Sequence, residues 1–341
     1  MGTASATTPG FVRAPEFWQR SDSAVARLLA PAGMAWLAAA KLRRAMARPY
    51  RAPVPVVCIG NLVAGGAGKT PVALAAARWY GARGLMVHLL SRGYGGRVVG
   101  PHRVDPALDT AADVGDEPLL LAARAPTWVA HDRAAGARAA AQAGAGLIVM
   151  DDGFQNPSLV KTLSLLVVDG GQGFGNGRVI PAGPLRERVD DGLARADAVV
   201  LVGEDRVGAL DALGSRVPVM RARLVPGADG ARYRGERVAA FAGIGRPQKF
   251  YQTLRDLGAL VVATRDFADH HRYEPEEVMA MVEHAAKRDA VLVTTAKDAV
   301  RLPPGALNMV HVLPVELAWD DEHGAGAILG RALDGSADGR A

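Results

Sequence analysis

Residues 60–71 read GNLVAGGAGKTP and carry most of a phosphate-binding loop. The standard pattern is G-x-x-x-x-G-K-[ST], and the position of its first glycine is held here by Val63. The chemistry survives this departure, because three further glycines let an anion approach consecutive backbone N–H groups at a helix N-terminus. We therefore predict a nucleotide-binding loop formed by Val63, Ala64, Gly65, Gly66, Ala67, Gly68, Lys69 and Thr70.

The residues on either side of this loop agree with that interpretation. Residues 54–60 form an apolar, β-branched run that predicts a buried strand, and residues 71–80 open with proline and continue as a helix former. Lys69 is expected to reach the terminal phosphates of a nucleotide, and the hydroxyl of Thr70 to bind Mg²⁺. Strand, glycine loop, Lys-Thr and helix together make an ordinary glycine-rich turn the weaker alternative.

The composition is that of a globular protein in a reducing compartment. The chain has 341 residues, of which 49% are hydrophobic and 22% charged, enough for two domains of ordinary size. Cys58 is its one cysteine, which excludes an internal disulfide framework, and its place in the apolar strand predicts a buried, unreactive thiol. No secretory signal is recognisable at the N-terminus.

The positive charge of the chain is concentrated near its N-terminus. Residues 1–51 hold eight Lys or Arg against two Asp or Glu, whereas the whole chain has a net charge of +5. The run LLAPAGMAWLAAA at residues 28–40 has no charge and is shorter than the ~20 apolar residues that span a bilayer. Its apolar residues recur at helical spacing and a basic cluster follows: Val25, Leu28, Leu29, Ala32, Trp36 and Ala39, then Lys41, Arg43, Arg44 and Arg48.

Two interpretations of this N-terminal segment remain open from its residues alone. It is either an amphipathic helix lying in an anionic membrane surface or a helix packed on its own domain with a solvated basic end. A nucleic-acid partner is not expected, because the basic cluster has no interleaved aromatic residues and no known binding motif.

Apolar strand-like runs alternate with alanine-rich helical stretches after the loop, which predicts a mostly parallel sheet wrapped by helices. The first set of runs is 85–90, 126–130, 146–150, 163–169 and 197–203, and a second, smaller set is 237–245, 259–267, 290–295 and 309–314. Between the sets, residues 225–236 look like a connection. We predict an N-terminal segment over 1–50, a P-loop core over 51–225, a smaller C-terminal α/β domain over 226–322 and a disordered tail over 323–341.

Paired carboxylates end one of the predicted strands. Residues 146–155 read GLIVMDDGFQ, and an acidic residue at the end of a strand near a P-loop commonly holds the Mg²⁺ opposite the Thr hydroxyl. Asp151 and Asp152 are therefore the predicted metal residues. A strand-ending Asp often only caps a turn, so the argument depends on the neighbouring GGAGKT.

Further polar motifs stand at strand or loop ends, where open α/β sheets bind ligands. SRGYGG at 91–96 carries Arg92 and Tyr94, DVGDEP at 113–118 carries Asp116 and Glu117, GPLRE at 183–187 carries Arg186, and DFADHHRY at 266–273 carries His270. Each alone is more often a satisfied turn or a surface charge. Their joint presence in a P-loop chain favours a catalytic site, with Arg92, Tyr94, Glu117, Gln155 and Arg186 as candidates for positioning substrate or phosphate.

Taken together, these motifs resemble the tetraacyldisaccharide 4′-kinases of lipid A synthesis over roughly residues 15–317. The resemblance rests on GNLVAGGAGKTP, SRGYGG, VGDEP, DDGFQ, GPLRE, FAGIGRPQKFYQTL, FADHHRY and TTAKDAVRL in this order. That family uses a GN-x-x-x-GG-x-GKTP loop, which explains the missing glycine. Two departures are visible: Asn156 stands where the family usually has histidine, and Ala296 where TTEKD would have glutamate.

The resemblance implies an α/β P-loop NTPase-like fold and a function. The expected reaction transfers the γ-phosphate of ATP, with Mg²⁺, to the 4′-hydroxyl of an acylated glucosamine disaccharide 1-phosphate. Asp116 is implied to accept the proton of that hydroxyl with help from His270, beside Lys69. A lipid substrate also gives the basic amphipathic helix a reason to lie on an anionic membrane, as a peripheral or monotopic protein at the cytoplasmic face of the inner membrane. No obligate protein partner is inferred.

Two alternatives come from other classes of protein. A switch or partitioning ATPase has a similar loop, but it gives no account of the lipid-facing segment or of an Asp/His pair. A GTPase would need an Asn/Thr-Lys-x-Asp motif, and here Lys297 and Asp298 are adjacent. A soluble small-molecule kinase with a merely structural N-terminal helix is the second alternative.

Overall fold

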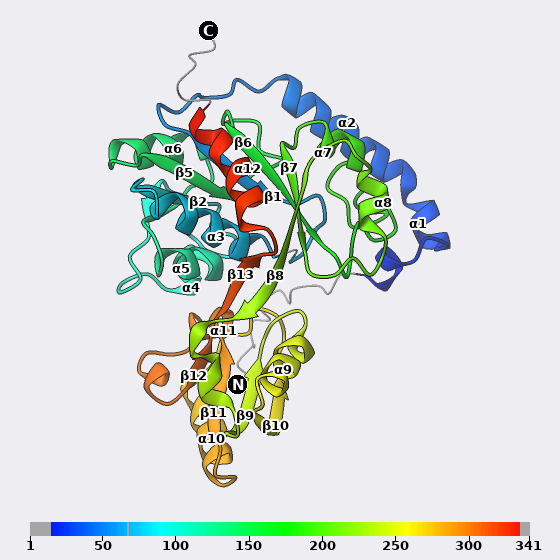
Figure 1. The fold of residues 1–341 in the computed structure, drawn as a ribbon. Coiled ribbons are helices and arrows are strands. Elements are labelled where there is room, and N and C mark those ends of the chain that lie inside the picture. Colours follow the sequence, from blue (N-terminus) through cyan, green and yellow to red (C-terminus); the bar gives the residue numbers. More distant parts are fainter. Residues whose placement is uncertain (1–14, 67, 335–341) are drawn as a thin grey trace, which may run out of the picture.

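The strands form two sheets in the computed structural model, which describes residues 15–66 and 68–334 (Figure 1). The larger sheet has nine strands in the order β13-β8-β7-β6-β1-β5-β2-β4-β3, and the smaller has four in the order β10-β9-β11-β12. Pairing is parallel except for β13 with β8 and β3 with β4. The predicted α/β class with a mostly parallel, P-loop NTPase-like sheet is confirmed.

Every strand predicted from the sequence has a counterpart in the structure. The strands of the larger sheet are β1 (Val56–Gly60), β2 (Val87–Ser91), β3 (His102–Arg103), β4 (Thr127–Val129), β5 (Leu147–Asp151), β6 (Leu163–Asp169), β7 (Ala198–Val202), β8 (Val219–Pro226) and β13 (Val315–Trp319). Three of these, β3, β8 and β13, were not predicted. The short β3 and the partly exposed β8 and β13 lack the continuous apolar runs that identify buried parallel strands.

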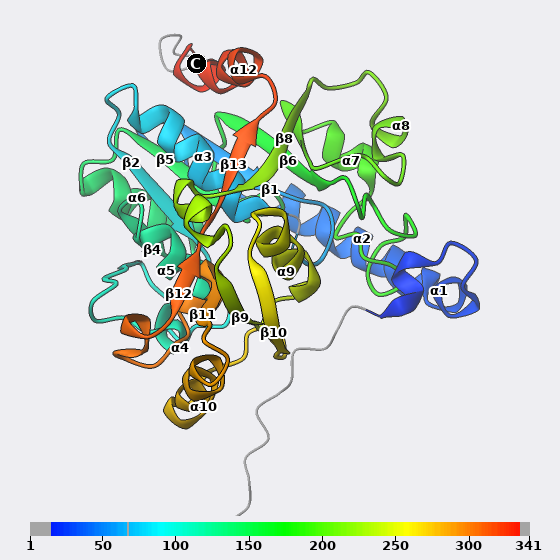
Figure 2. The same ribbon diagram turned by 60° about the horizontal axis from the view of Figure 1, so that its bottom comes forward.

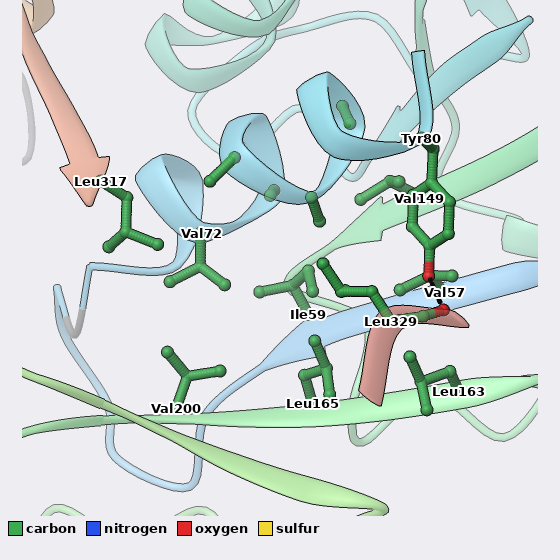
Figure 3. Packing of buried hydrophobic residues seen from close by; sticks show 14 of the residues in the cluster. Val57, Ile59, Val72, Tyr80, Val149, Leu163, Leu165, Val200, Leu317 and Leu329 are labelled. Atoms are coloured by element: carbon green, nitrogen blue, oxygen red, sulfur yellow. Dashed lines mark hydrogen bonds between the residues drawn. The ribbon is translucent and has the colours of Figure 1, made fainter. Parts of the chain in front are cut away.

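Side chains of the central strands alternate between two cores, one on each face of the larger sheet. On β1, Val57 and Ile59 join one core, and Val56 and Cys58 join the other. The first core is covered by α3 (Lys69–Gly81), α5 (Asp116–Ala122) and α12 (Glu322–Asp334), as Figure 3 shows in part. The second is covered by α2 (Ala30–Ala45), α6 (Arg133–Gln142), α7 (Val189–Leu193) and α8 (Ala209–Leu213).

The smaller sheet forms a second α/β unit with its own two cores. Its strands are β9 (Arg237–Ala242), β10 (Leu260–Asp266), β11 (Val291–Thr295) and β12 (His311–Leu313), all parallel. Helices α9 (Pro247–Asp256) and α10 (Pro275–Ala286) pack with these strands. The short helical elements found along the whole described chain are η1 (Glu16–Gln19), α4 (Ala111–Val114), η2 (Ala228–Tyr233), α11 (Ala296–Ala299) and η3 (Ala306–Asn308).

The second unit is inserted between two strands of the first. Strand β8 leads the chain into it and β13 brings the chain back, and the two pair antiparallel from Val315 opposite Pro226 to Trp319 opposite Ala222 (Figures 1 and 2). The predicted second domain, 226–322, therefore contains a strand that belongs to the first sheet.

The predicted disorder of the tail is wrong for residues 323–334. They belong to α12, whose Leu329 is fully buried against the first core and accepts a hydrogen bond from the Tyr80 hydroxyl at 2.7 Å (Figure 3). The remaining residues of the predicted tail, 335–341, lie outside the described residues.

The N-terminal segment is a pair of helices, α1 (Ala24–Leu28) and α2, lying along one side of the larger unit (Figure 2). One stripe of α2 packs on the protein: Gly33 lies against the Val179 carbonyl, and Leu37 joins the second core. Exposed apolar side chains occur along this segment, with Leu28 of α1 82% exposed, Leu42 of α2 62% and Met46, which directly follows α2, 73%. In the part of the chain that the structure describes, no helix has the length and apolarity needed to cross a bilayer.

Candidate active site

The phosphate-binding loop joins β1 to α3, as predicted. Gly68 has a φ of 81° and comes directly before α3, whose first residues are Lys69 and Thr70. Val63 and Ala64 are fixed to the 183–187 loop, through a bridge to Leu185 and a hydrogen bond from Ala64 N to Pro184 O. The phosphate-binding loop is therefore attached to the GPLRE motif at residues 183–187. The predicted loop residue Ala67 lies outside the described residues.

Lys69 is turned back onto its own loop. Its Nζ lies 3.3 Å from Asn61 Oδ1, 3.5 Å from the carbonyl oxygen of Gly65 and 3.8 Å from Asp152 Oδ2. Asn61 also donates to the Val63 carbonyl and is buried, so it braces both the loop and the lysine. The Lys69 ammonium can exchange these contacts for contacts with the phosphate oxygens of a bound nucleotide.

Thr70 and Asp151, the two residues predicted to share a metal, are brought together by adjacent strands. Because β5 pairs with β1, Asp151 ends beside the phosphate loop, and the Thr70 hydroxyl donates to its Oδ2 at 3.2 Å. Burial raises the pKa of Asp151 to about 7, and the charges of Glu117 and Asp152 act in the same direction while Lys69 opposes them. A cation bound at this carboxyl group would favour its ionised form.

The donor set fits a magnesium ion. The Oδ1 atom of Asp151 is buried without a hydrogen-bond partner among the described residues. Mg²⁺ prefers oxygen ligands, so this atom is available to bind it. Within residues 15–66 and 68–334, no group of three or more His, Cys, Asp or Glu side chains is assembled for a metal. A P-loop site needs none, since Mg²⁺ takes one or two protein oxygens, waters and the phosphates of the nucleotide.

Asp152, the second predicted metal residue, is held by cations instead. Arg186 donates to both of its carboxylate oxygens, at 2.8 and 3.2 Å. Burial acts to raise the pKa of Asp152, but Lys69 and Arg186 lower it below the ordinary value overall. The backbone of Asp152 has a φ of 51°, a conformation rarely held by residues other than glycine and often found at functional sites. Asp152 therefore links the lysine to Arg186.

Gln155 continues this network toward the 183–187 loop. Its side-chain nitrogen donates to the Asn61 carbonyl and to Glu187, and its oxygen accepts from Arg186 at 3.3 Å. Gly60, at the end of β1, leaves no room for a Cβ, which would lie 2.4 Å from Phe154. The loop after β5 can therefore pack directly on the end of β1.

Asp116 and His270, from different units of the fold, form a direct pair. His270 Nδ1 lies 2.7 Å from Asp116 Oδ2, and Lys297 Nζ lies 3.3 Å from His270 Nε2. Asp116 is the first residue of α5, and His270 has a left-handed φ of 61° in the loop after β10. The neighbouring Glu117 acts electrostatically on Asp151, so the pair stands close to the predicted metal residues.

The 91–96 loop is locked against the segment before Asp116. A Cβ at Gly115 would lie 2.5 Å from the Tyr94 carbonyl oxygen, and one at Gly96 would lie 2.6 Å from that of Asp113. Val98 N also donates to the Asp113 carbonyl. Tyr94 is thereby carried near Asp116 with its ring 64% exposed, and Arg92 is close enough to Arg133 to lower the pKa of that guanidinium.

Arg301 was not predicted, although it lies in the TTAKDAVRL motif. Its side chain is 1% exposed, its Nε lies 3.5 Å from Asp116 Oδ2, and it donates to the Gly243 carbonyl and to Asp298. Asp298 is itself buried and accepts from Tyr273 at 2.7 Å. The motif offered the signal, an Asp and an Arg three residues apart, which is the spacing of a pair on one helical turn.

Arg133 is a second residue that sequence reasoning missed. It opens α6, is buried, and its Nε lacks a partner among the described residues. Burial lowers its pKa to about 10, with Arg92 acting in the same direction and Asp152 and Asp151 opposing. One terminal nitrogen of Arg133 donates to the Ala130 carbonyl, and the unpartnered Nε beside the carboxylates is suited to an anionic ligand. The alanine-rich helical stretch gave no sign of it.

The two departures from the family pattern fall in different places. Asn156 accepts hydrogen bonds from the backbone and hydroxyl of Ser158 at 2.8 and 2.7 Å and so shapes the turn after DDGFQ. Ala296 begins α11 directly after its capping residue Thr295. Asn156 is next to Gln155 of the phosphate-loop network, and Ala296 is next to Lys297, which contacts His270.

The chain is similar to kinases over nearly its whole length. The family model described as tetraacyldisaccharide-1-P 4′-kinase matches residues 25–334. A tetraacyldisaccharide 4′-kinase of Rhodospirillum centenum is 57% identical over 96% of this chain and 98% of its own, and one of Paramagnetospirillum magneticum is 53% identical over 91% and 95%. The crystal structure of LpxK from Aquifex aeolicus in complex with ATP covers 90% of this chain and 99% of its own, with a TM-score of 0.73 and 25% identity.

Proposed function

The chain belongs to the tetraacyldisaccharide-1-phosphate 4′-kinase family, and we propose from this premise how its residues perform the family's reaction. It is an ATP-dependent phosphotransferase of lipid A biosynthesis that acts on an alcohol group, the 4′-hydroxyl of a tetraacyldisaccharide 1-phosphate. The observation that carries the assignment of roles is the contact between Asp116 and His270 across the two units, beside a phosphate loop.

Residues 63–70 bind the phosphates of ATP, with Lys69 exchanging its present contacts for the terminal phosphates. Thr70 and Asp151 would hold Mg²⁺, and Asp152 orients Lys69 and Arg186. When bound, the metal would supply positive charge that offsets the negative charge developing on the phosphoryl group. Lys69 adds to that stabilisation, because a cation fixed at the transferring group acts most strongly where charge builds up. The buried Oδ1 of Asp151 and the raised pKa of this residue support the metal assignment.

Asp116 takes the proton of the acceptor hydroxyl as its oxygen bonds to the γ-phosphorus, while the bond from that phosphorus to the bridging oxygen breaks and ADP leaves. A sugar hydroxyl is a weak nucleophile, so a carboxylate placed to receive its proton lowers the barrier. His270 and Arg301 hold Asp116 from the second unit, and Lys297 in turn contacts His270. Arg92, Tyr94, Glu117, Gln155 and Arg186 position substrate and phosphate around this centre.

The N-terminal helices place the enzyme on an anionic membrane surface, at the cytoplasmic face of the inner membrane. Exposed Leu28, Leu42 and Met46 supply apolar area, and exposed Arg43 and Arg48 stand beside them. The same helix touches the site. Trp36 Nε1 donates to the Arg186 carbonyl at 3.0 Å, so a lipid held at the helix reaches the catalytic loops.

A phosphoryl-transfer assay with ATP, Mg²⁺ and detergent-dispersed disaccharide 1-phosphate tests this function. Lys69→Ala is expected to abolish transfer while the melting temperature stays near that of the wild type. Transfer to water-soluble hydroxyl acceptors at the same efficiency would favour a soluble small-molecule kinase instead. Near wild-type kcat in folded Lys69→Ala protein would exclude the proposed role of the loop.

A further inference from the structure

Lys297 contacts the imidazole of His270 on the side opposite Asp116. Its Nζ lies 3.3 Å from His270 Nε2, whereas His270 Nδ1 lies 2.7 Å from Asp116 Oδ2. Lys297 belongs to α11, which directly follows β11, and His270 to the loop after β10, so both come from the second unit. The lysine of the TTAKDAVRL motif thus acts on the base, if at all, through the imidazole.

Asp269 holds the ammonium of Lys297 beside the ring. Asp269 Oδ1 lies 3.3 Å from Lys297 Nζ and also accepts from the backbone N of His270 at 3.1 Å. The side chain of Lys297 is 28% exposed, and the left-handed backbone of His270 turns its ring between the lysine and Asp116. One short loop therefore fixes the ammonium and the imidazole against each other.

This contact decides which ring nitrogen of His270 carries hydrogen. An ammonium group has three donors and no acceptor, so His270 Nε2 accepts from Lys297. A neutral imidazole has one donor and one acceptor, so Nδ1 carries the hydrogen and donates to Asp116 Oδ2. Asp269 does not change this assignment, because its Oδ1 lies 3.9 Å from Nε2, beyond hydrogen-bond distance.

The two neighbours of the ring therefore have different effects. Asp116 is satisfied by any form of His270 with a hydrogen on Nδ1, and that includes the imidazolium, in which both nitrogens are donors. Lys297 excludes the imidazolium, because its ammonium would then face a second donor and a second positive charge at 3.3 Å. Of the two residues, only the lysine keeps the ring neutral.

The contacts with the second unit also distinguish the two oxygens of Asp116. His270 Nδ1 and Arg301 Nε both contact Oδ2, at 2.7 and 3.5 Å. Donors to one carboxylate oxygen make that oxygen a poorer proton acceptor. Oδ1 is therefore the oxygen of Asp116 that is better placed to take a proton.

We propose that Lys297 is a positioning residue that keeps His270 neutral, as the Nδ1–H tautomer, while Asp116 acts as the base. The inference rests on the proposed function, in which Asp116 receives the proton of the acceptor hydroxyl. That proton moves to Asp116 Oδ1 as the hydroxyl oxygen bonds to the γ-phosphorus and ADP leaves. His270 retains its own hydrogen throughout, because Nδ1 already carries it and Nε2 accepts from Lys297. The imidazole orients the base and does not relay the proton.

The first test observes the two ring nitrogens of His270 directly. Heteronuclear NMR of protein labelled on its histidine nitrogens distinguishes protonated from unprotonated ring nitrogens, and the spectrum of His270→Ala assigns the signals. Near neutral pH the wild type should show Nδ1 protonated and Nε2 unprotonated. Lys297→Met removes the donor and the charge and should shift His270 toward the form protonated at both nitrogens. Lys297→Arg keeps both and should retain the wild-type form.

The second test is kinetic. Lys297→Met should lower kcat by about tenfold, equivalent to about 1.4 kcal/mol in the barrier, because a carboxylate beside an imidazolium is a weaker base. The KM values for ATP and for the acceptor should hardly change. In a His270→Ala background the same substitution should have almost no further effect, because Lys297 acts through the imidazole. Lys297→Arg should recover most of the rate.

Lys287→Met is the matched control, since it removes the same charge from an exposed lysine directly after α10. It should change neither kcat nor the signals of His270. Equal melting temperatures of Lys297→Met and the wild type exclude misfolding as the cause of a loss.

Three results would overturn the proposal: a wild-type His270 protonated at Nε2, His270 signals that Lys297→Met leaves unchanged, or an equal loss of kcat with and without His270. The last result would assign Lys297 to the folding of the loop alone. Wild-type protein that transfers no phosphate would contradict the proposed function instead, and NMR would still report the state of His270.

Discussion

The imidazole Nδ1 of His270 lies 2.7 Å from the carboxylate Oδ2 of Asp116, although 154 positions separate the two residues along the chain. The two belong to different units of the fold, so this contact exists only while the second unit stands against the first. A kinase built this way assembles its base from both units, and a displaced second unit would leave Asp116 without His270.

Asp116→Asn should cut kcat by about 10²–10⁴-fold with little change in the KM for ATP, because the amide cannot accept the hydroxyl proton. If the pair acts as one unit, adding His270→Ala should cost far less than the product of the two single losses. Steady-state kinetics of both single variants and the double variant check this. Losses that multiply would separate the two residues, and loss of ATP or Mg²⁺ binding in Asp116→Asn would reassign Asp116 to the metal.

Arg301→Gln should lower kcat without weakening ATP binding. Its guanidinium contacts Asp116 and is fixed by Asp298, so its loss frees the base and leaves Asp298 buried with one donor fewer. Arg301→Lys keeps the charge but not the planar geometry and should recover only part of the rate. Arg255→Gln, an exposed arginine of α9, is the control. A kcat unaffected by either Arg301 variant in folded protein would show that the residue only supports the second unit.

Asp151→Asn should raise the stability of the metal-free protein above about pH 4. The unfolded pKa of an aspartate is about 3.9 and the folded pKa of Asp151 is about 7. Between these values the unfolded chain releases a proton that the folded protein retains, so the free energy of unfolding falls as pH rises, and above pH 7 the deficit is constant. The variant removes a penalty of roughly 2–4 kcal/mol at neutral pH.

Thermal denaturation in a chelator from pH 4 to pH 8 measures this difference. The difference in stability between Asp151→Asn and the wild type should widen as the pH rises from about 4 to about 7 and then level off. Asp190→Asn is a control of opposite sign, because a hydrogen bond from Arg216 lowers the pKa of this exposed carboxylate.

In activity assays, Asp151→Asn should need far more Mg²⁺ for half-maximal activity. A Mg²⁺ titration identical to that of the wild type would refute the role of Asp151 as a ligand.

Arg43→Glu with Arg48→Glu should weaken binding to anionic vesicles. Each basic group near such a surface contributes about 1 kcal/mol, so two reversals are readily measured by vesicle sedimentation. Arg44 is left unchanged because it pairs with Glu187. Arg255→Glu with Lys287→Glu reverses two exposed charges of the second unit and should have little effect. Equal binding by both double variants would favour a purely structural N-terminal helix.

The sequence predicted best what depends on local pattern. Continuous apolar runs identified the buried parallel strands, and glycines with Lys69 and Thr70 identified the phosphate loop. It also selected Thr70 and Asp151 as partners, because a strand-end carboxylate beside a P-loop is a recurring arrangement. These patterns can be read from the sequence because burial and backbone geometry restrict which residues can occupy each position.

Contacts between distant segments that no motif marks could not be predicted. Arg301 and Arg133 lie on ordinary-looking helical stretches, and only the folded chain shows that one touches Asp116 and the other is buried beside the carboxylates. The tail was misjudged for the same reason. Alanine and glycine in α12 resemble a disordered composition until the packing of Leu329 on the core is known.

The return of the chain through β13 and α12 has a consequence for synthesis of the enzyme on the ribosome. The first sheet lacks an edge strand, and its core lacks Ala325 and Leu329, until the ribosome has passed the second unit and made β13 and α12. The second unit, whose strands are complete earlier, can fold first, whereas the nucleotide-binding unit closes only once β13 and α12 have joined it. A fragment ending at residue 314 should therefore show exchange protection in β9–β12 and little in β1.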